Sequence, residues 1–203
     1  MAPKYGEITR ARSPTCRNPF NSIGCPSLTI QLHSSERQTA FNLNRWRELL
    51  ADPELARLPH RIETDRHGRI LMSPPPALAH GNQQNEIGFW LRTLLPQGQV
   101  VTECPLSTSD GVKAIDVAWL APERRQEVHS VSCLLRAPEI CVEVLSPSNT
   151  SEEISEKIAL YFESGAREVW ICERGTLRFH FSATPEVRQL SEMCPGFPPQ
   201  INV

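Results

Sequence analysis

Two carboxylates interrupt otherwise apolar stretches of the sequence. Asp116 lies within VKAIDVAWL and Glu143 within ICVEVL. Both stretches are typical of strands that are covered on both faces. Ionised carboxylates are rarely buried in such strands unless they are paired or bound to metal. A lysine, Lys157, follows on a predicted helix, so the residue types needed for metal-assisted chemistry on a phosphate are present.

Carboxylate oxygens on neighbouring strands are hard ligands that suit Mg²⁺ or Mn²⁺. A bound ion could polarise a phosphodiester and activate water, and an ammonium group could stabilise charge on the phosphorus. Each residue also has a purely structural interpretation. Asp116 could be a turn-side acid, Glu143 could pair with an arginine, and Lys157 could pair with Glu153 at i,i+4. Spacing alone leaves these alternatives open.

The segment from Pro138 to Trp170 is predicted to form a strand, a helix and a second strand. Thr150 and Glu153 have the capping-box spacing that opens a helix. Lys157 falls on the rim of the apolar face of this helix. From there its side chain could reach back over the end of the preceding strand, which carries Glu143.

Further candidate residues lie upstream. The segment HRIETDRHGRILMSPPP is typical of a hairpin, and its first strand carries Glu63. A helix to about residue 95 follows, and His80 and Gln84 begin its inward stripe. His80 is either a histidine at the core edge with one hydrogen bond, or a residue that supports a metal ligand or contacts phosphate. Gln84 is a candidate for the same role.

The remaining pattern predicts strands at 100–106, 112–120, 168–172, 177–181 and 187–190, and a polar irregular segment at 121–136. That segment carries the nearest cluster of basic residues (Arg124, Arg125 and Arg136), which is either solvated or in contact with nucleic acid. The predicted fold class is α/β (α+β), a mixed sheet flanked by two principal helices.

Length and composition favour one core domain. The chain has 203 residues, of which 39% are hydrophobic, and we assign 39–203 to this domain. Residues 1–38 lack helical or strand periodicity. They are predicted to be either a disordered extension or a segment that results from a start codon assigned too far upstream. The seven cysteines include no CxxC pair, which indicates reduced thiols in a cytoplasmic protein. No apolar run is long enough for a membrane span. The net charge of −2 provides no overall basic footprint for nucleic acid.

Three segments together resemble the Uma-two family, whose members are classed with the restriction-endonuclease-like PD-(D/E)xK nucleases. They are IDVAWL, APEICVEVLSPSN and EKIALYFESGAREVWI. The preceding IETDRHGRILMSPPPALAHG is similar to the family's E-x-x-x-x-G-x-x-x-x-x-P segment that ends in histidine. The resemblance covers roughly residues 41–200, and the combination of EVLSPS, a downstream lysine and GAREVW is its most specific part.

The resemblance implies a restriction-endonuclease-like fold and a metal-dependent DNA endonuclease. It places the first acid at Asp116, the second at Glu143 and the catalytic lysine at Lys157, with Mg²⁺ (or Mn²⁺) as the ion. Glu63 matches the family's early acid, either as a third metal ligand or as an anchor of the turn through Arg66, and His80 matches its histidine. Two departures are Ile115, where the superfamily has proline, and Leu145, where an E-x-K lysine would stand.

Cutting both strands of duplex DNA requires two sites, so we also expect a homodimer. Two other functions remain open. One is a catalytically inactive DNA-binding module on the same fold, because fold does not determine function. The other is a protein-interaction module whose carboxylates only anchor structure. The weakly acidic net charge favours these two alternatives slightly, because duplex binders usually carry a basic face.

Overall fold

The computed structural model of the protein describes residues 26–201, so the N-terminal part of the predicted extension, residues 1–25, lies outside the described chain. Its centre is a six-stranded mixed sheet in the order β3-β4-β5-β6-β7-β8. The strands are β3 (Gln99–Thr108), β4 (Gly111–Leu120), β5 (Ile140–Val144), β6 (Glu168–Glu173), β7 (Thr176–Phe181) and β8 (Thr184–Arg188). A separate hairpin pairs β1 (Arg61–Thr64) with β2 (Ile70–Ser73). The helices are α1 (Pro26–Ala51), η1 (Leu55–Arg57), α2 (Leu78–Leu94), η2 (Pro122–Arg124), α3 (Glu127–Ser130) and α4 (Ser151–Glu163).

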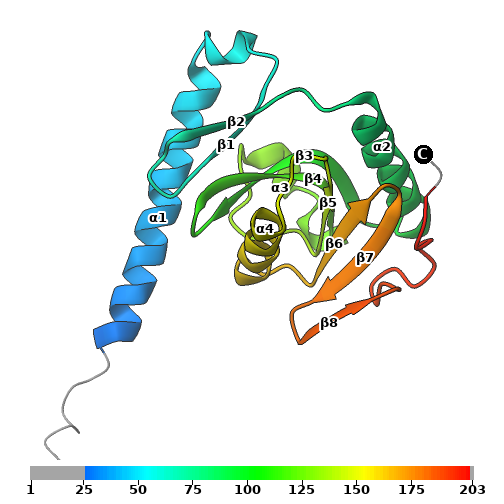
Figure 1. The fold of residues 1–203 in the computed structure, drawn as a ribbon. Helices are drawn as coiled ribbons and strands as arrows, with labels where there is room; N and C mark the ends of the chain where they lie inside the picture. The colour runs from blue at the N-terminus through cyan, green and yellow to red at the C-terminus, as the bar shows by residue number, and fades with distance from the viewer. Residues whose placement is uncertain (1–25, 202–203) are drawn as a thin grey trace, which may run out of the picture.

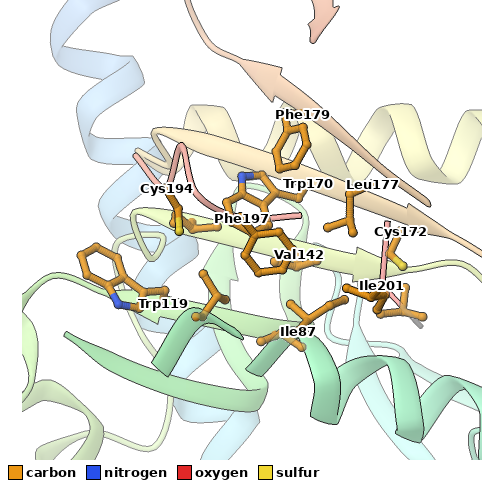
Figure 2. Packing of buried hydrophobic residues seen from close by; sticks show 14 of the residues in the cluster. Ile87, Trp119, Val142, Trp170, Cys172, Leu177, Phe179, Cys194, Phe197 and Ile201 are labelled. Atoms are coloured by element: carbon orange, nitrogen blue, oxygen red, sulfur yellow. The ribbon is translucent and has the colours of Figure 1, made fainter. Parts of the chain in front are cut away.

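The two principal helices pack against the sheet in separate apolar clusters (Figure 1). Ile87 and Leu91 of α2 join the cluster that contains Trp170. The C-terminal segment completes this cluster, in which the Trp170 ring meets Phe179 and Phe197 edge to face, with centroids 5.0 and 4.7 Å apart (Figure 2). In the other cluster, α4 packs its apolar face on β4, β5 and β6. The predicted mixed α/β fold is confirmed.

Helix α4 is the crossover between the parallel strands β5 and β6, and its start follows the predicted capping box. The Thr150 hydroxyl accepts a hydrogen bond from the Glu153 amide at 3.2 Å, and the Glu153 carboxylate accepts one from the Thr150 amide at 3.0 Å. Two amides that have no partner within the helix are therefore satisfied. Gly165 follows the helix with φ +99°, a conformation that glycine adopts without steric cost.

We expect Thr150→Ala to lower the free energy of unfolding by about 1 kcal/mol, because the cap hydrogen bond is lost at an exposed helix end. Urea denaturation followed by circular dichroism measures this change. Ser155→Ala is the matched control, since Ser155 is an exposed hydroxyl residue within the same helix. Equal stability of the Thr150 variant and wild type would show that the capping box contributes nothing measurable.

Helix α1 starts before residue 39, where the core domain is predicted to begin. It begins at Pro26 and therefore crosses the predicted domain boundary at residue 38. Its C-terminal half is tied to the sheet, because Asn42 donates hydrogen bonds to the Ser107 hydroxyl and the Thr108 carbonyl, both at 2.9 Å. Trp46 joins a third apolar cluster with the hairpin and β4. No helix within residues 26–201 is both long and apolar enough to cross a bilayer.

The predicted polar segment 121–136 is only partly irregular, since it contains η2 and α3. Arg124 is buried and forms ion pairs with Glu127 and Glu139, so the prediction of a solvated or nucleic-acid-binding side chain is wrong for this residue. Its guanidinium also donates to the carbonyls of Ala137 and Arg136, at 2.5 and 2.9 Å. These contacts of Arg124 hold the segment between β4 and β5 against the residues that lead into β5.

The five described cysteines are free and buried, as the sequence pattern indicates (Cys104, Cys133, Cys141, Cys172 and Cys194). Burial raises the pKa of Cys104 and of Cys133 to about 12. Both thiols therefore stay protonated at neutral pH and behave as small apolar side chains.

Candidate active site

Strand register brings three carboxylates into one row across the sheet. Val117 of β4 pairs with Val142 of β5, so Asp116 and Glu143 are the next residues on the two strands. On the other side of β4, the register places Glu103 of β3 opposite Asp116. The Asp116 carboxylate accepts a hydrogen bond from the Val144 amide at 2.6 Å, at the point where β4 and β5 separate. The two predicted acids therefore lie at one level of the sheet.

Asp116 is almost completely buried and is surrounded by cations and donors. Its Oδ1 atom accepts a hydrogen bond from Arg61 Nη1 at 2.5 Å and lies 3.4 Å from His80 Nε2. Burial alone would raise the pKa of Asp116, but His80, Arg61 and the Val144 amide together lower it. Asp116 is thus held as a carboxylate, and contact with Asp116 in turn raises the pKa of His80.

Glu143 lies on the α4 side of the row and is also buried. Its Oε2 atom accepts a hydrogen bond from Lys157 Nζ at 3.0 Å, and its Oε1 atom accepts one from the Tyr161 hydroxyl at 2.6 Å. Burial raises the pKa of Glu143, Lys157 opposes this shift, and the Asp116 charge adds to it. Both donors come from α4, so this helix sets the orientation of the carboxylate.

Lys157 lies between two carboxylates. Besides its bond to Glu143, its Nζ donates to Glu63 Oε1 at 3.1 Å. Burial alone would lower the pKa of Lys157, but Glu143 and Glu63 raise it above its ordinary value. Within residues 26–201 Lys157 forms no ion pair with Glu153, which instead caps the helix. The prediction that Lys157 reaches back over the β5 end agrees with this geometry.

Glu63 fastens β1 to β4 rather than anchoring the turn. Its Oε1 atom accepts a hydrogen bond from the Ala114 amide at 3.0 Å as well as the one from Lys157. The alternative of an anchor through Arg66 is wrong, because Arg66 pairs with Asp110. Gly111 permits this close approach of β1, since a Cβ atom there would lie 2.3 Å from the Thr64 carbonyl oxygen.

Arg61, which no sequence pattern indicated, lies among the acids. Besides Asp116, its guanidinium contacts Glu103 at 3.3 Å and Glu63 at 3.5 Å. Burial alone would lower the pKa of Arg61, but the surrounding carboxylates, Asp116 first and then Glu143, raise it. The buried Nε and Nη2 atoms have no partner with hydrogen-bond geometry within residues 26–201. The sequence carried no signal for Arg61, because arginine in a short hairpin strand is ordinary.

The N-terminal half of α2 brings His80 and Gln84 to the same place. Gln84 Nε2 donates to Glu103 Oε1 at 2.7 Å and to Asp116 Oδ1 at 3.3 Å. Glu103 was also missed, although its signal resembled that of the other two acids: it interrupts the strand VVTECPL. Of the predicted site residues, all six lie in this one assembly: Glu63, His80, Gln84, Asp116, Glu143 and Lys157.

One group of potential metal ligands stands out within the described chain. His80, Glu103 and Asp116 each offer a ligand atom, and these atoms lie within 4.8 Å of one another. The predicted set of Asp116, Glu143 and Glu63 does not form such a group. The site holds four carboxylates against the two cations Arg61 and Lys157, a formal charge of −2 with His80 neutral. This donor set and its charge fit a divalent cation.

Comparisons with known proteins agree with this fold. The family model Uma2, described as "Putative restriction endonuclease", matches residues 50–196. A solved structure titled as a putative nuclease belonging to DUF820, from Anabaena variabilis, is similar, with a TM-score of 0.54 and 19% sequence identity. The similarity covers 64% of this chain and 76% of that chain. No curated protein matches the sequence.

Proposed function

Because the chain belongs to the Uma2 family of restriction-endonuclease-like proteins, we propose that it is a metal-dependent DNA endonuclease. The observation that carries the proposal is the assembly of Asp116, Glu143 and Lys157 at one point, from two adjacent strands and the following helix. Carboxylates can hold a metal ion and a lysine can stabilise developing negative charge, and both suit hydrolysis of a phosphodiester. The cytoplasmic location and the homodimer remain predictions.

In this proposal Asp116 and Glu143 hold a divalent ion, Mg²⁺ or Mn²⁺. Each carboxylate oxygen has more than one lone pair, so Glu143 can keep its bonds from Lys157 and Tyr161 while it faces an ion. A bound ion would act as a Lewis acid on the phosphodiester and would favour ionisation of a water molecule.

Lys157 acts as a hydrogen-bond donor and not as a base, because Glu143 and Glu63 favour its charged form. Its ammonium group positions the attacking water and stabilises negative charge that grows on the phosphorane oxygens. The Tyr161 hydroxyl and the Lys157 ammonium together keep Glu143 in one orientation. Positioning of this kind before the reaction avoids reorganisation during it.

The alternative is a module on the same fold that binds DNA or protein and does not cut. The ion pair between Arg61 and Asp116 favours it, since buried charge networks that only support structure also perturb pKa values. Retained DNA binding without turnover would select a DNA-binding module, and absence of both metal and DNA binding would select a protein-interaction module.

A plasmid-nicking assay with Mg²⁺ or Mn²⁺ tests the proposal. We expect wild-type protein to nick DNA only with metal, and Asp116→Asn and Lys157→Met each to reduce the rate by about a hundredfold or more. Glu156→Gln is the matched control, because Glu156 is an exposed neighbour of Lys157 on α4. Circular dichroism establishes that each variant is folded.

Three results would count against parts of this proposal. Cleavage that survives in Lys157→Met would remove the lysine from the mechanism but retain the enzyme. Cleavage that survives in Asp116→Asn would remove Asp116 from the metal-holding set, and equal cleavage in all variants would indicate a contaminating nuclease. The absence of wild-type cleavage on supercoiled, linear and single-stranded DNA would favour the non-cutting alternative.

A further inference from the structure

We propose that Glu103 and His80 complete the metal-holding set around Asp116, so that Glu103, and not Glu63, is the third carboxylate and the site prefers Mn²⁺ to Mg²⁺. This inference rests on the proposed function, since it assigns ligands to the ion of the same site. It adds one residue that the sequence pattern did not single out and gives His80 a direct role.

The first support is geometric. The ligand atoms of His80, Glu103 and Asp116 lie within 4.8 Å of one another, close enough for small side-chain rotations to place all three around one ion. The β3–β4 register sets Glu103 opposite Asp116. Gln84 Nε2 bridges the two carboxylates.

The second support is the backbone of Glu103. It has φ +51°, the left-handed conformation that a non-glycine residue rarely adopts. Glu103 and Asp116 are also omitted from the otherwise continuous pairing of β3 with β4, which resumes at Cys104 and Ile115. This local departure from strand geometry coincides with the side chain that approaches Asp116 and Arg61.

Glu63 is a poorer candidate for a ligand because its contacts serve the structure. The same atom, Oε1, accepts from both the Ala114 amide and Lys157, and this fastens β1 along the part of β4 that β5 leaves unpaired. The Glu63 carboxylate lies outside the His80–Glu103–Asp116 group, and moving it there would break its hydrogen bonds to a partly buried amide and an ammonium. Its role is therefore to position Lys157 and the hairpin.

Solvent access also distinguishes the acids. The side chain of Glu103 is 45% exposed, whereas that of Asp116 is 1% exposed. Ions of this kind keep several water ligands. Glu103 would therefore meet an ion from the solvent side, where water ligands can remain, and Asp116 from the buried side. In its neutral form the imidazole of His80 would add a nitrogen ligand, which binds Mn²⁺ more readily than the harder Mg²⁺.

Isothermal titration of the intact protein with MnCl₂ and with MgCl₂, without DNA, tests the assignment. We expect Glu103→Gln to weaken Mn²⁺ binding by about tenfold or more. His80→Gln should lower the affinity for Mn²⁺ more than the affinity for Mg²⁺. The ratio of the two affinities should therefore be smaller in this variant than in wild type. Glu63→Gln should change Mn²⁺ affinity less than Glu103→Gln does.

Glu173→Gln is the matched control. Glu173 is also on a strand, is 47% exposed, and pairs with an arginine, Arg178. The Glu173→Gln substitution should leave Mn²⁺ affinity unchanged. Circular dichroism and thermal melts establish that each variant is folded.

The possible results separate this inference from the proposed function. Unchanged Mn²⁺ affinity in Glu103→Gln, with binding abolished in Asp116→Asn, overturns the role of Glu103 and leaves the nuclease proposal intact. If Glu63→Gln loses more Mn²⁺ affinity than Glu103→Gln does, the assignment of Glu103 and not Glu63 as the third carboxylate is overturned. Tighter wild-type binding of Mg²⁺ than of Mn²⁺ overturns the ion preference. Absence of wild-type metal binding overturns both proposals.

Discussion

Arg61→Gln is expected to lower the free energy of unfolding at neutral pH by about 3–5 kcal/mol, the range for removing one partner of a buried charge network. Arg61 is the cation nearest to the buried Asp116, and it also contacts Glu63 and Glu103. Glutamine can still donate one hydrogen bond but carries no charge. The remaining carboxylates would therefore repel one another in surroundings of low polarity. Urea denaturation at pH 7 measures the loss.

The dependence of this loss on pH follows from the pKa of Asp116. Arg61 helps to lower that pKa in the folded protein. A lowered carboxyl pKa contributes stability that is present above the unfolded-state value, and this contribution disappears as the pH falls through the folded-state value. The difference between wild type and Arg61→Gln should therefore shrink as the pH falls below about 4.

Arg66→Gln is the matched control for Arg61→Gln. Arg66 lies in the turn of the same hairpin and pairs with Asp110, but its side chain is 59% exposed. The exposed pair should contribute about 0–1 kcal/mol. If the two variants lost equal stability, Arg61 would be no more than a surface ion-pair residue, and the picture of a charge-compensated site would be wrong.

Glu168→Gln is expected to lower the free energy of unfolding by about 3 kcal/mol. The reason is that a buried carboxylate that accepts four hydrogen bonds is replaced by an amide that can accept at only one atom. Glu168 is 1% exposed, and within residues 26–201 no cation pairs with it. Its Oε1 atom accepts from the amides of Glu192 and Met193, at 2.9 and 2.6 Å. Its Oε2 atom accepts from the Trp170 indole and the Ser191 hydroxyl, both at 2.7 Å.

These hydrogen bonds hold the C-terminal segment against the sheet. Phe197 of this segment packs on Trp170, so loss of the Glu168 contacts should loosen the segment before the sheet unfolds. Hydrogen exchange should show faster exchange of amides in 191–201 than in β6. Glu192→Gln is the control, since Glu192 is an exposed residue with an ion pair to Arg188. Uniform acceleration throughout the sheet would contradict this local role.

Several features followed from the sequence because they depend on near neighbours. Asp116 and Glu143 could be recognised because a charged side chain within an apolar strand must be paired with a cation or bound to a metal. The capping box placed the start of α4, and 3.6-residue periodicity then placed Lys157 on the rim that faces β5. The two covering helices followed from the same periodicity, and the strands of the mixed sheet followed from short apolar runs.

Other features depend on contacts between residues that are distant in the sequence. Arg61 is 55 residues from Asp116, and Lys157 is 94 residues from Glu63, so no local pattern indicates either pair. Strand register alone set Glu103 opposite Asp116. The burial of Arg124 likewise required the chain to return at Glu139.

The sequence by itself therefore indicated two of the acids, Asp116 and Glu143, and the lysine Lys157, because burial of charge constrains each residue separately. The tertiary structure decided their partners and, with them, the charge of the site. The physical reason is that a Coulombic or hydrogen-bonded pair depends on distance in space, and only the packing of β1, β3 and α2 around β4 sets that distance.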